Sequence, residues 1–138
     1  MNTVAPFFID THCHLDAAEF DVDRDGVYAR AVELGVGIQV VPAVSRNNFA
    51  AVAATCARYP GCLPAWGLHP MYIGVHRPAH LADLRAQIEA QRPVAVGEIG
   101  LDFFVTDLDP ATQETFLVEQ LKIAREFDLP VLLHCRRA

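Results

Sequence analysis

The chain has 138 residues, of which 52% are hydrophobic and 20% are charged. This balance indicates a folded chain with enough apolar residues for a core, and it excludes an intrinsically disordered protein. The formal net charge is -6, so the sequence lacks the basic composition that usually marks a nucleic-acid-binding surface. The charge does not exclude a phosphate-bearing substrate, because bound divalent cations neutralise carboxylates and hold phosphates.

No segment of the sequence predicts a membrane span. The longest apolar stretch, 35–44, is interrupted by Gln39 and Pro42, and residues 1–6 contain neither basic residues nor an apolar signal core. The cysteines stand at irregular spacing within or beside predicted elements, as buried reduced thiols do: Cys13, Cys56, Cys62 and Cys135. We therefore expect a cytoplasmic protein, without a membrane or an obligate protein partner.

Strand-like and helix-like segments alternate along the chain. Apolar runs predict five strands, at residues 7–11, 36–41, 63–68, 94–99 and 130–134. Between them, apolar residues at helical spacing predict four helices, with the stripes Val27, Ala31 and Leu34; Phe49, Val52, Ala53 and Cys56; Leu81, Leu84 and Ile88; and Leu117, Leu121 and Ala124, flanked by Phe116, Ile123 and Phe127. The fourth helix, which begins at Asp109 and Pro110, has the favoured order of cap and first helical residue.

Strands that are apolar on both faces and alternate with helices predict a parallel sheet covered by helices. The expected fold class is α/β, built from consecutive units of a TIM (β/α)8 barrel. A complete barrel takes about 250 residues, so about four βα units and a fifth strand correspond to a truncated barrel. We expect residues 1–138 to form the N-terminal part of a single barrel domain.

Residues that bind metals stand at the ends of three predicted strands. Asp10, His12 and His14 alternate along the end of the first strand, so their side chains point to one side. Glu98 ends the fourth strand and His134 ends the fifth, at the carboxyl-terminal mouth where barrel active sites lie. We therefore predict a divalent-metal hydrolase with His12, His14, Glu98 and His134 at the metal, and with Asp10 beneath the histidines as an orienting residue.

Each of these residues also has a purely structural interpretation. A buried, hydrogen-bonded pair would account for His12 and His14, and an ion pair with an arginine would account for Glu98. Glu98 shares the parity of Val94 and Val96, which places it toward the barrel axis, where a carboxylate needs a cation or a donor. Three strands that end in His-x-His, Glu and His are harder to attribute to core packing than any one of them.

Two further residues are predicted near the same mouth. His69 ends the third strand and is a candidate for contact with the substrate or with the metal ligands. Arg136 has the same parity as His134, so it can reach over the mouth to an anionic group of a substrate. A solvated arginine is the alternative for Arg136.

Spaced motifs along nearly the whole chain resemble those of the TatD family of metal-dependent deoxyribonucleases: Ile9–Asp16, Gly67–Pro70, Val96–Phe103, the helix residues Gln113, Phe116 and Gln120, and Leu129–Arg136. The resemblance implies a TIM-barrel metallohydrolase with two divalent ions, which are Mg, Mn or Zn. In this scheme His12 and His14 bind one ion, His134 binds the other and Glu98 bridges both. The resemblance also implies that the substrate is DNA, cleaved at phosphodiester bonds, often from the 3′ end.

The chain departs from the family pattern in two places. The family supplies a further histidine ligand and an aspartate that acts as ligand and base, and neither has a counterpart here. The segment 103–105 is wholly apolar, whereas the family often has a basic or polar residue there.

Two other functions stay open. An amidohydrolase that acts on C–N bonds shares the His-x-His motif, but its metals are often bridged by a carboxylated lysine on strand four. The only lysine of this chain is Lys122, on a predicted helix, which favours Glu98 as the bridge. The second alternative is an inactive truncated fragment of the nuclease.

Overall fold

The computed structural model describes residues 7–138 and contains a five-stranded parallel sheet with the strand order β1-β2-β3-β4-β5. The strands are β1 (Phe8–Asp10), β2 (Val36–Pro42), β3 (Cys62–Trp66), β4 (Ala95–Asp102) and β5 (Val131–Arg136). The α-helices are α1 (Arg24–Glu33), α2 (Phe49–Arg58), α3 (Ala79–Ala90) and α4 (Pro110–Glu126), and short 3-10 helices are η1 (Ala18–Phe20), η2 (Arg46–Asn48) and η3 (Pro70–Tyr72). Neighbouring strands are therefore consecutive in the chain, with one α-helix in each connection, as in a TIM-type barrel.

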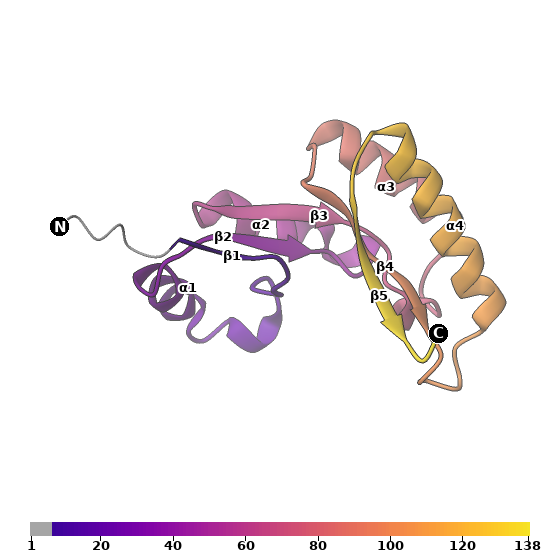
Figure 1. The fold of residues 1–138 in the computed structure, drawn as a ribbon, viewed down its shortest axis with the longest axis horizontal. Helices are drawn as coiled ribbons and strands as arrows, with labels where there is room; N and C mark the ends of the chain where they lie inside the picture. The colour runs from indigo at the N-terminus through magenta and orange to yellow at the C-terminus, as the bar shows by residue number, and fades with distance from the viewer. Residues whose placement is uncertain (1–6) are drawn as a thin grey trace.

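The two faces of the sheet have different surroundings. The main core lies between the sheet and the helices and is built around buried residues such as Trp66, Leu84 and Ile123. A smaller cluster holds one residue from each of β2 to β5 and none from a helix: Val40, Ala65, Ala95 and Leu132. Figure 1 shows α3 and α4 side by side, with α4 along β4, and the strand direction turning from β1 to β5. The smaller cluster thus marks the concave, barrel-interior face.

The predicted alternation of strands and helices is confirmed, and two helical stripes are corrected. In α1, Leu34 lies at the C-terminal end of the helix and is 74% exposed instead of packing with Val27. In α4, Leu121 is exposed, and the buried face is formed by Gln113, Phe116, Gln120, Ile123 and Ala124. The two glutamines are buried on this face, where their amides bind the backbone at strand ends.

These glutamine bonds connect α4 to the carboxyl ends of β3 and β4. Gln113 accepts from the backbone N–H of Asp102 at 2.7 Å and donates to its carbonyl at 2.9 Å. Gln120 makes the same pair of bonds to Leu68, at 2.7 and 3.1 Å. Buried backbone groups at the end of a strand or just past it lack a ladder partner on at least one side, so an amide side chain supplies both a donor and an acceptor.

An irregularity in β4 sets the direction of Glu98. The pairing register of β4 with β5 shifts between Val96 and Ile99. Ala95 belongs to the barrel-interior cluster and Val96 to the core under the helices, so regular alternation would turn Glu98 toward the helices. Because β4 has one extra residue between Val96 and Ile99, the side chain of Glu98 points to the barrel interior instead. The predicted direction of Glu98 was right, but the parity argument from Val96 was wrong.

Gly100 allows the close approach of β4 and β5 beside this irregularity. Its φ is +149°, and a Cβ atom there would lie 1.8 Å from the carbonyl oxygen of His134. No side chain fits at that distance, so Gly100 is required for the two strands to bring Glu98 and His134 together.

The cysteines follow the sequence prediction in part. Cys62 is buried, and Cys13 and Cys56 are partly buried, but Cys135 is exposed. The prediction of a buried thiol is wrong for Cys135 because, in the sheet formed by residues 7–138, β5 is an edge strand and Cys135 lies near its end. Within residues 7–138, no helix has both the length and the apolar composition needed to cross a membrane.

Candidate metal centre

The two carboxylate oxygens of Glu98 face two different groups of histidines. Oε2 lies 3.0 Å from Nε2 of His12 and 3.6 Å from Nε2 of His14. Oε1 lies 3.2 Å from Nε2 of His69 and 3.0 Å from Nδ1 of His134. Among the residues that the structure describes, Glu98 forms no ion pair with an arginine, so that interpretation of Glu98 is wrong. Four strand ends therefore converge on one carboxylate.

The first group, His12, His14 and Glu98, has the spacing of ligands around one ion. The two Nε2 atoms of the histidines are 3.3 Å apart, and both lie close to Oε2 of Glu98. Donor atoms about 2.1 Å from a common ion are about 3.0–3.4 Å apart at octahedral or tetrahedral angles. The observed separations therefore fit a divalent cation with little movement of the side chains.

His69 has a defined tautomer. Its Nδ1 accepts the backbone N–H of Met71 at 3.0 Å, and a backbone N–H can only donate. The neutral ring therefore carries its proton on Nε2 and donates it to Oε1 of Glu98. Both ring nitrogens are engaged and His69 is buried, so the geometry favours contact with the ligand Glu98 over contact with a substrate.

His134 lies between two carboxylates. Its Nε2 is 2.8 Å from Oδ2 of Asp102, while its Nδ1 faces Glu98. Asp102 is fully buried, and its other oxygen accepts the backbone N–H groups of Phe104 and Val105 at 3.0 and 3.3 Å. When Nε2 donates to Asp102, Nδ1 carries the free lone pair that a cation needs.

Asp102 is the site residue that the sequence interpretation missed. It was included in a motif but was given no role. Glu98, Gly100 and Asp102 share one parity, and past the irregularity of β4 that parity points into the barrel. This spacing was available in the sequence and could have identified Asp102.

The remaining predicted residues lie at the edge of the centre. The carboxylate of Asp10 accepts the backbone N–H of His12 at 3.1 Å, so it contacts the main chain of a candidate ligand and not its ring. The guanidinium of Arg136 lies 3.9 Å from Asp102 and 3.6 Å from the centre of the Phe104 ring. Its side chain is 44% exposed, so the role of Arg136 toward a substrate stays a prediction.

The electrostatics keep the central carboxylates ionised. Burial raises the pKa of Glu98, but hydrogen bonds from His14 and His69 outweigh it and hold this pKa well below its usual range. The pKa of Asp102 is also lowered, because the hydrogen bonds from His134 and from two backbone N–H groups outweigh its burial. The hydrogen bond to Glu98 raises the pKa of His14. Ionised Glu98 is the form that a cation requires.

Comparisons with known proteins agree with this geometry. The family model described as TatD related DNase matches residues 9–138. The chain is 46% identical over 133 residues to an uncharacterized metal-dependent hydrolase, YjjV, of Escherichia coli, and covers 51% of that protein. It is 38% identical over 129 residues to the 3′-5′ ssDNA/RNA exonuclease TatD of Cronobacter sakazakii and covers 49% of it. Each match includes 94% of this chain, which spans about half the length of these relatives.

Solved structures show the same fold. The crystal structure of E. coli YjjV superposes with a TM-score of 0.88 over 94% of this chain and 51% of that chain. A TatD family hydrolase from Entamoeba histolytica, at 23% identity, superposes with a TM-score of 0.86 over 98% of this chain and 52% of that one, and supports the fold. The sequence match across almost all of the described residues decides the family: this chain belongs to the TatD-related DNases.

Proposed function

We propose that the protein that contains this chain hydrolyses phosphodiester bonds of DNA, from the 3′ end, with two divalent ions. One observation supports this proposal most strongly: the two oxygens of Glu98 are divided between two groups of histidine nitrogens. A carboxylate in this arrangement is suited to bridge two cations. The name of the Cronobacter relative, a 3′-5′ ssDNA/RNA exonuclease, supports the choice of substrate.

In this proposal, His12 and His14 would hold one ion through Nε2, His134 would hold the other through Nδ1, and Glu98 would serve both. Bound ions of the Mg, Mn or Zn class would polarise the phosphodiester and lower the pKa of an attacking water. Imidazole donors favour Mn or Zn, and the carboxylate bridge is compatible with Mg.

Two residues position these donors. His69 donates from Nε2 to Glu98 and is itself oriented by the N–H of Met71, which keeps the carboxylate turned into the barrel. Asp102 accepts from Nε2 of His134 and leaves Nδ1 free for the cation. No described residue is assigned as the general base.

The structure does not favour the C–N hydrolase. Lys122 lies on α4, where it pairs with Glu119 at 2.6 Å, and its side chain is 66% exposed. It is the only lysine of the chain, so no described lysine is placed to bridge metals.

We further propose that residues 1–138 are the N-terminal part of a single TIM-barrel domain, and that the protein is cytoplasmic. The first proposal is supported by the coverage of about half of each relative and by the open edges of β1 and β5. The second is supported by the cysteines, which are free thiols and not disulfide-bonded: Cys13, Cys56, Cys62 and Cys135.

The test is hydrolysis of single-stranded DNA labelled at the 5′ end, by this chain alone and by the product of the complete reading frame that encodes it. With Mn²⁺ we expect progressive shortening from the 3′ end by the complete product, arrest by a chelator, and loss in Glu98→Gln. Cleavage by the complete product but not by the 138-residue chain would identify the chain alone as an inactive fragment. The absence of metal-dependent cleavage in both proteins would contradict the proposed function.

A further inference from the structure

A cavity of about 680 Å³ opens beside His14. We infer that this cavity, named here the His14 cavity, binds the base and sugar of the 3′-terminal nucleotide of single-stranded DNA. The inference rests on the proposed function, since it places the scissile phosphate at the metal centre. The volume lies in the range of about 300–1,000 Å³ that is usual for small-molecule sites.

The walls of the cavity come from the segments that follow β1, β2 and β3. Phe20 belongs to the first of these, Val44 to the second and Tyr72 to the third. Such segments build the active site at the carboxyl-terminal face of a barrel. His14 lines the cavity and also faces Glu98. The ring of Tyr72 packs edge to face against the ring of His69, with the two ring centroids 6.0 Å apart. The cavity therefore adjoins the candidate metal centre at His14, and its wall residue Tyr72 packs against His69.

The lining favours an uncharged, flat group over a phosphate. It combines the aromatic rings of Phe20 and Tyr72 with small apolar side chains such as that of Ala51. Its acidic residues are Asp16 and Glu19, and no lysine or arginine lines it. A phosphate is repelled by these carboxylates, whereas a base stacks on aromatic rings and its amino groups are attracted to acceptors. The phosphate would thus remain at the cations while the nucleoside enters the cavity.

The loop that carries the first wall is held in place by Arg24. Its guanidinium donates to the carbonyl groups of Leu15 and Ala17, each at 2.7 Å, and pairs with Asp21 at 2.6 Å. On the second wall, Asn48 donates to the carboxylate of Asp16 at 3.0 Å. A cavity whose walls are tied before the ligand arrives loses less entropy on binding.

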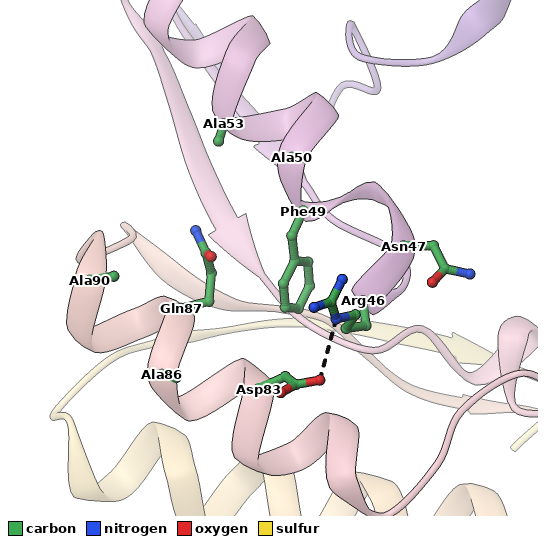
Figure 2. Close-up of a pocket in the computed structure, with 9 residues that line it drawn as sticks. All are labelled: Arg46, Asn47, Phe49, Ala50, Ala53, Asp83, Ala86, Gln87 and Ala90. Atoms are coloured by element: carbon green, nitrogen blue, oxygen red, sulfur yellow. Dashed lines mark hydrogen bonds and ion pairs between the residues drawn. The ribbon is translucent and has the colours of Figure 1, made fainter.

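A second hollow provides the control. This second cavity has a volume of about 440 Å³ and is lined by residues of η2, α2 and α3. In Figure 2, Arg46 pairs with Asp83 and Phe49 points between the helices. None of its lining residues belongs to the candidate metal centre. Ala50 lines this hollow and Ala51 lines the His14 cavity, and both are exposed residues of α2. Leucine at either position fills one hollow without removing a core group.

The experiment measures binding and not cleavage. Fluorescence anisotropy is recorded in Mn²⁺ with single-stranded phosphorothioate oligonucleotides that end at the 3′ side in a normal nucleotide or in an abasic one. For the complete product without a substitution, called the wild type here, and for its Ala50→Leu variant, we expect the oligonucleotide with the normal 3′ nucleotide to bind about tenfold more tightly than the abasic one. Ala51→Leu and Tyr72→Ala are expected to abolish this preference, and Tyr72→Phe, which keeps the ring, is expected to retain it.

The outcomes separate this inference from the proposed function. Equal binding of the two oligonucleotides by the wild type, or a preference that persists in both Ala51→Leu and Tyr72→Ala, overturns the His14 cavity as the base site and leaves the nuclease proposal intact. The absence of any binding by the wild type overturns both. Circular dichroism of each variant establishes that a lost preference reflects the cavity and not the fold.

Discussion

The two sides of Glu98 differ in how their histidines are held. On one side, the rings of His12 and His14 are 38% and 37% exposed, and their Nε2 atoms contact only each other and Glu98. On the other side, the rings of His69 and His134 are 7% and 18% exposed, and both nitrogens of each ring have partners. The buried side is organised by the protein, and the exposed side is left for a cation to organise.

This difference separates two loosely held ligands, His12 and His14, from the ligand His134 and the support His69, which the protein itself orients. Donors that have no other partner are free to move onto an ion, whereas donors in a closed hydrogen-bond network are already held in place. Glu98 is the one residue that belongs to both sides. Changes on the exposed side should therefore affect metal binding alone, and changes on the buried side should also affect stability.

The largest effect is expected for Glu98→Gln. The amide keeps the shape of the side chain but removes the charge that both sides share, so we expect Mn²⁺ affinity to fall by more than about 100-fold. Isothermal titration calorimetry measures the affinity, and circular dichroism measures the fold. Glu119→Gln, which removes an exposed carboxylate on α4, is the control. Wild-type affinity in Glu98→Gln would show that the carboxylate is not a ligand.

Asp102→Asn tests the buried side through one support. The amide can present its N–H to Nε2 of His134, which moves the ring proton to Nδ1 and blocks the lone pair that faces Glu98. We expect Mn²⁺ affinity to fall about 10- to 100-fold. Asp107→Asn, a change outside the site, should leave the affinity unchanged. If Asp102→Asn binds Mn²⁺ as the wild type does, His134 is not oriented by Asp102.

A pair of alanine variants compares the two sides in stability. His69→Ala leaves the N–H of Met71 without its acceptor and removes one donor to Glu98, so we expect a loss of about 1–3 kcal/mol in the free energy of unfolding. His14→Ala should change it by no more than about 0.5 kcal/mol, because the ring is partly exposed. Urea denaturation without metal gives both values. Equal losses would remove the distinction between the two sides.

The smallest effect concerns two thiols next to candidate ligands. Cys13 lies between His12 and His14 but packs toward the helices, and burial raises its pKa to about 11. At about pH 8 only a small fraction of Cys13 is thiolate. Cys13 is also partly buried, whereas Cys135 is exposed. A thiol reagent should therefore label Cys135 first and Cys13 only after unfolding, as followed by mass spectrometry. Labelling of Cys13 at the rate of Cys135 would place Cys13 on an accessible surface.

The order of strands and helices could be predicted because the spacing and number of apolar residues in each segment reflect which side chains are buried. The sequence could not predict the bonds that satisfy strand ends, so Gln113 and Gln120 were not placed in the core, although both were noted as part of a family motif. The irregularity of β4 depends on pairing with β5, which is a long-range contact, and so the parity of Glu98 was argued wrongly. The sequence predicted that His12, His14 and His134 lie near Glu98, but which carboxylate oxygen each histidine faces depends on the fold.

The most direct test of the account is a crystal structure of the protein grown with Mn²⁺, with the ions located by anomalous scattering. The account predicts one ion about 2.0–2.3 Å from Nε2 of His12, Nε2 of His14 and Glu98, and a second near Nδ1 of His134 on the other oxygen of Glu98. His69 should remain bonded to Glu98 and to Met71 and touch neither ion. An ion bound by Nε2 of His69, or no ion on Glu98, would contradict the account.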